Sequence, residues 1–395
     1  MTVDSSFFCS MHDVADVGPE QLCDNLLALG LTGVTVAATY HAARDLRPRG
    51  SLQRLIDLPA GAHYFPASPD YPHGLEPSTP APFGDSDLLT ALRTATTERG
   101  MRLAAWTVFG FQERLGRAQP GLCQRTIFGD PSTSDLCPAN PLVRTWALTL
   151  AADVARHRPD ALVAESLHYA PLRLTRRFLP LDAEARLALG LCFCVHCVDA
   201  ARSAGVDVDA VRVWAAVTVE SAFAGERRED ATPKPLDELP EAVRAFLTAR
   251  AGVVSALVKE TVELLAPSGV ALRMLDQAAV EPPTLGPSIV GEAFRSGVDV
   301  AETARMSGGY QVLGYGEDID DVARTVNDYR HAIGADAGMR VVLRPSWPDC
   351  IETHNLEAKI AAALESGAEG VDFYHYGFAS HDALDRVGVA LRGLR

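Results

Sequence analysis

The feature that most constrains the fold is a regular alternation of apolar, β-type runs with helical patterns along the whole chain. Several runs are uninterrupted aliphatic stretches, which is typical of parallel strands covered on both faces. Eight strand–helix units in one continuous chain favour an α/β fold of the closed (β/α)8 barrel type over an open doubly wound sheet. The expected strands are residues 7–11, 33–40, 102–108, 161–164, 270–275, 310–314, 340–344 and 370–374.

Helix ends can also be read from the sequence. Pro19 is expected at the first helical position, because its missing N–H costs nothing there. Asn140 and Asn355 are expected as N-caps, since a short polar side chain accepts a hydrogen bond from a free backbone N–H.

Two segments are longer than a usual connection in such a barrel. Residues 44–84 are rich in proline, glycine and arginine and are expected to cover the barrel mouth after the second strand. Residues 167–268 follow the fourth strand. We therefore expect a single barrel domain over residues 1–395, with residues 167–268 as an inserted helical subdomain.

Composition excludes several classes of protein. No run approaches the ~18 apolar residues of a membrane span, and the first residues have no basic and apolar export signal, so a soluble, cytoplasmic protein is expected. A net charge of −15 argues against nucleic acid as a partner and favours a neutral or cationic small ligand. A homo-oligomer is compatible with the sequence, which does not determine the oligomeric state.

A cluster of cysteines predicts a metal site. Cys192, Cys194 and Cys197 have a spacing that brings three thiolates around one tetrahedral ion, and structural zinc takes four ligands. The best candidate for the fourth is Cys137, because its loop opens on the same face of the barrel. Alternatives are His196 and Cys123 as fourth ligand, or a set of reduced thiols without metal.

The fourth expected strand ends in a carboxylate, Glu165, at the position where barrel enzymes carry their chemistry. Ser166, His168 and Tyr169 follow, and their side chains can form hydrogen bonds to a polyhydroxyl ligand. The alternative is a carboxylate that only pairs with an arginine at the barrel rim.

The order of these features resembles glycoside hydrolase family 42 and related bacterial glycosyl-hydrolase-like (β/α)8 barrels. The resemblance rests on residues 137–197, and residues 371–377 of the last strand add to it. It implies zinc on the cysteines and a general acid/base at Glu165. The sequence departs from the family where Ala164 precedes Glu165 instead of Asn, and where the seventh strand ends without a carboxylate for the nucleophile.

Hydrolysis of a glycosidic bond requires a second carboxylate that attacks the sugar or activates water. Asp276, at the end of the fifth expected strand, is the first candidate because neighbouring strands lie only ~4.8 Å apart. Glu352 and Asp372 are the alternatives.

Polar and aromatic residues recur at the strand ends and are expected to bind a sugar, since aromatic faces suit pyranose rings. These are His12, Tyr40, His41, Arg44, Trp106, His168, Tyr169, Arg344, Trp347, Tyr374 and His375.

Four arginines leave two interpretations open. Arg44, Arg47, Arg49 and Arg344 either converge on an anionic group, for which the guanidinium is suited, or pair with the abundant acids of the chain. A catalytic metal on histidines is disfavoured, because no His-x-His follows the first strand.

The sequence therefore predicts a glycoside hydrolase-like enzyme with structural Zn²⁺, no organic cofactor and a small carbohydrate or glycoside as substrate. Two alternatives stay open: a catalytically silent sugar-binding barrel, and a barrel enzyme with non-hydrolytic acid/base chemistry, such as a lyase or isomerase. The missing carboxylate on strand seven keeps both open.

Overall fold

The chain folds around eight parallel strands that close into a barrel, because β1 pairs with both β13 and β2. This computed structural model describes residues 3–394 except 52, 82, 84, 85, 172–180, 227–232 and 281–287. The fold confirms the predicted (β/α)8 barrel, and each expected strand overlaps an observed one. The strands are β1 (Ser5–Cys9), β2 (Gly33–Tyr40), β6 (Arg102–Val108), β9 (Ala161–Glu165), β10 (Ala271–Asp276), β11 (Gly309–Leu313), β12 (Gly338–Leu343) and β13 (Gly370–Phe373).

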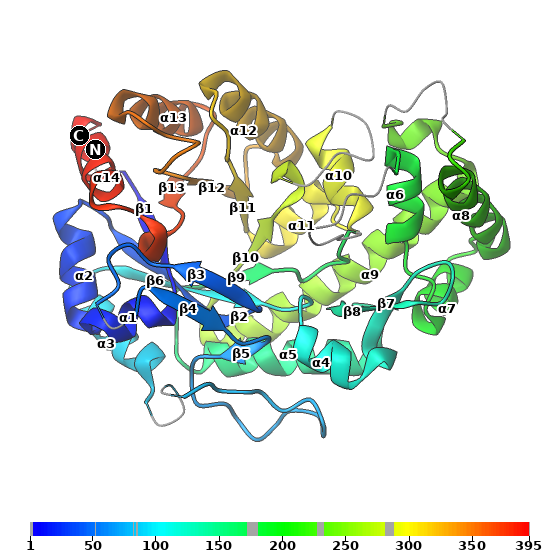
Figure 1. Cartoon of the computed structure of the whole chain (residues 1–395), viewed down its shortest axis with the longest axis horizontal. Helices are drawn as coiled ribbons and strands as arrows, with labels where there is room; N and C mark the ends of the chain where they lie inside the picture. Colours follow the sequence, from blue (N-terminus) through cyan, green and yellow to red (C-terminus); the bar gives the residue numbers. More distant parts are fainter. Residues whose placement is uncertain are drawn as a thin grey trace.

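Helices pack around the outside of the barrel, as Figure 1 shows for α2, α12, α13 and α14. Pro19 opens its helix as predicted, and Asn140 caps α5 by accepting a 2.9 Å hydrogen bond from the Leu142 N–H. The prediction for Asn355 is wrong, because α13 begins at Thr353 and Glu352 holds the cap position. The helices are α1 (Met11–Val17), α2 (Pro19–Ala28), α3 (Leu88–Glu98), α5 (Pro141–Ala155), α9 (Glu241–Leu265), α10 (Ile289–Arg295), α11 (Val300–Ser307), α12 (Ile319–Ile333), α13 (Thr353–Glu365) and α14 (His381–Gly393).

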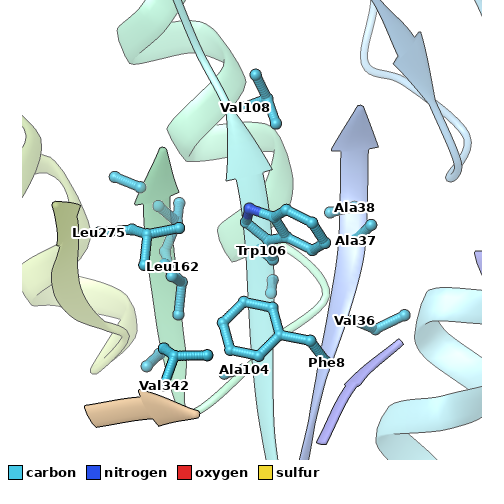
Figure 2. Packing of buried hydrophobic residues seen from close by; sticks show 14 of the residues in the cluster. Phe8, Val36, Ala37, Ala38, Ala104, Trp106, Val108, Leu162, Leu275 and Val342 are labelled. Atoms are coloured by element: carbon cyan, nitrogen blue, oxygen red, sulfur yellow. The ribbon is translucent and has the colours of Figure 1, made fainter. Parts of the chain in front are cut away.

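Strand register decides which side chains enter the barrel. Glu165 pairs with Leu275 on β10 and with Val108 on β6. Paired residues of parallel strands point to the same face and alternate along each strand. Figure 2 shows the interior packing of Trp106 against Phe8, whose rings lie 5.2 Å apart at 75°.

The segment after β2 forms small antiparallel strands over the barrel mouth. β3 (Ala43–Leu46) pairs with β4 (Leu55–Leu58), and β5 (Ala62–His63) adds to the barrel sheet beside β2. On the inner face of the β3–β4 hairpin Ile56 and Leu58 are buried, so this face packs onto the barrel. A further excursion after β6 contains α4 (Glu113–Ala118), β7 (Cys123–Arg125) and β8 (Pro131–Leu136).

The segment after β9 contains α6 (Ala183–Gly190), α7 (Val195–Ser203) and α8 (Val208–Phe223). Figure 1 places these three helices at the side of the barrel away from both chain termini. They pack with the first half of α9 around a second apolar core that includes Phe193, Val211 and Phe246. The second half of α9 packs on the barrel core through Val254 and Val258. The insertion therefore has its own core but shares one helix with the barrel.

No helix in the described part of the chain is long and apolar enough to span a membrane.

Candidate active site

A cavity of about 190 Å³ lies at the C-terminal ends of the barrel strands, the end that carries the active site in barrels of this type. Its walls come from β1, β2, β6, β9, β10, β11, β12 and β13 or the residues just after them. The lining residues are Phe8, Tyr40, His41, Trp106, Glu165, Leu275, Gln277, Val280, Leu313, Tyr315, Arg344 and Tyr374.

Glu165 is the last residue of β9, and only 5% of its surface is exposed. The indole N–H of Trp106 donates a 2.6 Å hydrogen bond to Oε2. The side-chain amide of Gln277 donates a 2.8 Å hydrogen bond to Oε1. Each oxygen therefore has one donor from the wall, which fixes the carboxyl plane, and keeps a further lone pair for a ligand.

Two tyrosine hydroxyls meet beside this carboxylate. The Tyr40 and Tyr374 oxygens lie 3.4 Å apart. Burial raises the pKa of Tyr374 to about 12, although the hydrogen bond with Tyr40 acts in the opposite direction and the charge of Glu165 adds to the increase. Burial also raises the pKa of Tyr40 well above 10. Both groups therefore stay protonated at neutral pH and can donate hydrogen bonds to a ligand oxygen.

The remaining cavity wall is mostly aromatic. Trp106 makes edge contacts with Phe8, Tyr40 and Tyr374 at 5.2, 4.8 and 6.0 Å between ring centroids. Tyr315 lies 6.1 Å from Tyr374. Flat apolar faces next to polar edges are suited to bind a sugar ring.

Asp276 does not join Glu165 in the cavity, so the geometry contradicts the pairing expected from the sequence. Leu275 pairs with Glu165 and faces inward, so Asp276 points to the outside of the barrel. There its carboxylate accepts hydrogen bonds from the Tyr310 hydroxyl and, at 2.7 Å, from the Ala278 N–H.

The two alternative partners are also placed elsewhere. Glu352 is exposed and lies 3.1 Å from His354. Asp372 is inside the barrel but at the opposite end, where Arg340 donates two hydrogen bonds of 2.9 and 2.7 Å to it. Burial acts to raise the pKa of Asp372, but the charge and hydrogen bonds of Arg340 lower it below its usual value. Asp372 is therefore an ionised partner of Arg340.

A carboxylate that the sequence analysis missed is Asp45, on the hairpin over the mouth. Ala43 and Asp45 are half-buried and alternate with exposed Arg44 and Leu46, so Asp45 faces the barrel. Burial raises the pKa of Asp45 to about 6. Its charge acts on both Tyr40 and Tyr374, as that of Glu165 does. The signal available in the sequence was only the period-2 pattern of a short strand.

The other residues expected to bind sugar separate into two groups. Tyr40, His41, Trp106, Arg344 and Tyr374 line the cavity, and the structure adds Phe8, Gln277 and Tyr315 to them. The rest lie outside the lining. His12 packs on Phe83, His168 Nδ1 lies 2.8 Å from the Tyr169 carbonyl oxygen, and the Tyr169 hydroxyl lies against Cys197. His375 accepts a hydrogen bond from the Gly377 N–H, Arg44 pairs with Asp57, and Trp347 is 79% exposed.

The four predicted metal ligands come together. The sulfur atoms of Cys137, Cys192, Cys194 and Cys197 lie within 4.8 Å of one another, and all four residues are buried. All four are free thiols, with Cys137 Sγ 3.5 Å from Cys194 Sγ and 3.4 Å from Cys197 Sγ. A compact set of four thiols is the donor set of a structural zinc site. Among the described residues Cys137 is the fourth member of this group, and His196 and Cys123 are not part of it.

This cysteine cluster is connected to the segment that follows Glu165. The hydroxyl of Tyr169 lies 3.4 Å from Cys197 Sγ, and the Tyr169 N–H donates a 3.0 Å hydrogen bond to the Ser296 carbonyl. The Arg125 N–H donates to Cys192 Sγ at 3.3 Å. The cluster thus joins the excursion after β6, the insertion and the chain just after β9.

Comparisons with solved structures find other proteins with a similar fold. No family model matches the sequence, and no curated protein sequence matches it. A β-galactosidase from the psychrophilic Marinomonas ef1 has a similar structure, with a TM-score of 0.57 and 11% identity over 99% of this chain and 59% of that chain. The catalytic domain of the β-amylase from Paenibacillus polymyxa has a TM-score of 0.56 and 10% identity over 99% of this chain and 98% of that one.

At these identities the likeness establishes the fold and no activity. This chain spans less than two thirds of the length of the β-galactosidase. Membership of glycoside hydrolase family 42 stays a prediction.

Proposed function

We propose that the protein is a glycoside hydrolase-like enzyme that cleaves a glycosidic bond of a small sugar or glycoside, with Glu165 as general acid/base. The observation that carries this proposal is a buried carboxylate held by Trp106 and Gln277 in an aromatic cavity at the C-terminal end of the barrel. The two similar barrels described above are, by name, a β-galactosidase and a β-amylase, which supports a carbohydrate as ligand.

The arrangement suits proton transfer to a leaving oxygen. The donors from Trp106 and Gln277 hold the carboxyl group in one orientation, and a general acid must reach the glycosidic oxygen at hydrogen-bond distance. The hydroxyls of Tyr40 and Tyr374 would donate to sugar oxygens next to that bond. An aromatic wall excludes water from the other side of the ring.

For the second carboxylate we propose Asp45. It lies on the face of the β3–β4 hairpin that is turned to the barrel. A base with a pKa of about 6 is mostly ionised at neutral pH and can accept a proton from water. Because Asp45 belongs to the cover over the mouth, it would act from the side of the ligand opposite the cavity floor.

The experiment begins with a screen of aryl glycosides of several sugars in both anomers. On any substrate that is cleaved, Glu165→Gln should lower turnover by about 10²–10⁴-fold, because general acid/base groups contribute that range. Gln keeps the shape and loses the proton. Glu352→Gln is the matched control, since Glu352 is exposed and outside the cavity.

Turnover by Glu165→Gln at the wild-type rate would rule out the assignment. Cleavage that depends on Glu165 but not on Asp45 would support the enzyme class and rule out only Asp45 as the second carboxylate.

One observation favours a second candidate function. Among the described residues that line the cavity, Glu165 is the single carboxylate. Acid/base chemistry without hydrolysis, as in a lyase or isomerase, needs only one such group together with the tyrosine hydroxyls. An unsaturated elimination product differs from the hydrolysed product by the mass of one water, and an isomerised product, which keeps the mass of the substrate, is separated from it by chromatography.

We also propose that Cys137, Cys192, Cys194 and Cys197 hold a structural Zn²⁺. Four thiolates leave no open coordination position, so the ion would do no chemistry on the substrate. Its contribution would be to fix the insertion to the chain that follows Glu165, through Tyr169.

A further inference from the structure

Four arginines were expected as possible anion ligands near the barrel mouth. Three of them form ion pairs or hydrogen bonds with other groups of the protein. Arg44 pairs with Asp57 on the hairpin, Arg47 with Asp13 and Asp16 in a buried cluster, and Arg49 donates to the backbone carbonyls of Tyr376 and Ala379. These contacts satisfy their charge or their donors. Only Arg344 lines the cavity.

Arg344 follows β12 and continues the inward-facing positions of that strand. Its guanidinium carbon lies 3.7 Å from the centre of the Tyr315 ring. The nearest acid among the described residues is Asp349, whose Oδ1 is 3.9 Å from Nη1, beyond hydrogen-bond length. Asp349 instead accepts a 3.2 Å hydrogen bond from the Gly316 N–H through Oδ2. The side chain of Arg344 is 41% exposed, so its N–H donors are open to a ligand.

Stacking determines what this guanidinium can bind. A guanidinium that lies over an aromatic ring uses its face and leaves its edge free. The edge presents parallel N–H donors that match the two oxygens of a carboxylate. Tyr315 thus holds Arg344 in an orientation suited to a planar anion, and a loosely hydrated, fixed cation is better suited to this than a mobile lysine.

The positive charge of Arg344 contrasts with the negative charge of the whole chain. The whole chain carries a net charge of −15, which repels anions at long range. Arg344 is the only Lys or Arg among the described lining residues, and Glu165 stands on another part of the wall, since β11 and β10 lie between β12 and β9. A ligand that reaches both groups has its reacting bond near Glu165 and its anionic group near Arg344.

We propose that the substrate is an acidic sugar and that Arg344 binds its carboxylate. This inference rests on the proposed function, because it takes the cavity as the sugar site. It names uronic acid-type glycosides as the substrate class, in contrast to the neutral or cationic ligand expected from the net charge. A single guanidinium matches one carboxylate; a phosphate dianion is an alternative that the test separates.

The test measures binding to the full chain, independently of turnover. Calorimetric titration with methyl glucuronide and methyl glucoside, in both anomers, compares ligands that differ only by the carboxylate. The wild type should bind the glucuronide more tightly by about 10–100-fold, the range of a charge-assisted pair. Arg344→Gln should remove this preference, because it removes the charge that distinguishes the two ligands.

Arg344→Lys is the second variant and should retain part of the preference, because it keeps the charge and loses the parallel donors. Arg324→Gln is the matched control, since Arg324 is an exposed residue of α12 that pairs with Asp321. Thermal unfolding of each variant checks that the fold is kept.

The outcomes separate this inference from the proposed function. Equal affinity for the two methyl glycosides, tighter binding of glucose 6-phosphate than of the glucuronide, or a preference that persists in Arg344→Gln overturns the inference. Glu165-dependent cleavage of neutral aryl glycosides would in that case leave the proposed function standing. Conversely, an Arg344-dependent preference for glucuronide without any cleavage supports the inference and removes the hydrolase.

Discussion

The two ends of the barrel interior contain the same kinds of residue in different states. At the N-terminal end, Asp372 accepts hydrogen bonds from Ser6, Gln311 and Arg340. At the C-terminal end, Glu165 accepts one hydrogen bond on each oxygen, and Arg344 has no acid within hydrogen-bond distance among the described residues. Both ends hold a buried carboxylate and an arginine, but only the second leaves them available.

The difference teaches that a buried charge in a barrel indicates a ligand site only when its partners are counted. Removing a charge from water is costly unless the protein supplies partners. At the N-terminal end each carboxylate oxygen of Asp372 has at least two donors, so this group stabilises the barrel. At the C-terminal end the partners are incomplete, and a ligand can supply the rest. The following predictions test this contrast, from the largest expected effect to the smallest.

Substitutions at the N-terminal end of the barrel should lower the stability of the protein without a direct effect on catalysis. Asp372→Asn removes the fully buried partner of Arg340 and leaves it only the partly exposed Asp4, 3.2 Å from Nη1, which costs about 3–5 kcal/mol of the free energy of unfolding. Asp57→Asn breaks an exposed pair with Arg44 and should cost under about 1 kcal/mol. Urea unfolding measures both. A loss in Asp372→Asn no larger than in Asp57→Asn would contradict the assignment of Asp372 to structure.

The cysteine cluster should hold metal and brace the cavity end. We expect about one zinc ion per chain in the purified protein, since closed thiolate sites retain zinc. Cys194→Ser should lose the ion, whereas Cys23→Ser, at a buried cysteine of α2, should keep it. Metal analysis by mass spectrometry reads this out directly.

Tyr169→Phe extends the same test to the contact around the metal. Removing the hydroxyl that lies 3.4 Å from Cys197 Sγ should lower the affinity for zinc by about 10–100-fold, which is the usual effect of losing a group that contacts a metal ligand. Competition with a chelator measures the affinity. An unchanged affinity would show that Tyr169 only packs there.

Asp45 should determine the acid limb of the rate profile. Because the pKa of Asp45 is about 6, its side chain is ionised above that pH and becomes protonated as the pH falls below it. The rate should therefore decrease about tenfold per unit below pH 6. Asp45→Asn should remove this limb and lower the rate at pH 7, whereas an unaltered profile would exclude Asp45 from the chemistry.

The last prediction concerns His63, a buried histidine of β5 at the mouth. Burial lowers its pKa from 6.5 to about 3, with the charge of Arg114 adding to it, so the folded protein holds it neutral. Between pH 6.5 and 3 only the unfolded chain takes up the proton. The free energy of unfolding should therefore be complete above pH 6.5 and fall by up to about 1.4 kcal/mol per pH unit below it.

His63→Phe should flatten this slope between pH 6.5 and 5, measured by thermal unfolding at several pH values. His73→Phe, at an exposed histidine, is the control that should leave it unchanged.

The sequence by itself determined the barrel, the position of Glu165 and the metal-type cysteines. Period-2 and helical patterns are local, so they identify eight strand–helix units without any tertiary information. The C-x-C-x-x-C spacing is likewise local, and the placement of Cys137 followed once the barrel order placed its loop on the same face. Glu165 was found because the C-terminal end of a strand has one fixed role in this fold.

Only the tertiary structure decided the partners. Asp276 and Gln277 are neighbours in the sequence, yet the register of β10 against β9 turns Gln277 toward Glu165 and Asp276 away from it. A shift of one residue would reverse them, and no local pattern sets that register. The same holds for the arginines, because whether a guanidinium is free depends on acids that come from distant segments. Arg44 and Arg344 look alike in the sequence, and only the folded chain places an acid 2.6 Å from the first and no closer than 3.9 Å to the second among the described residues.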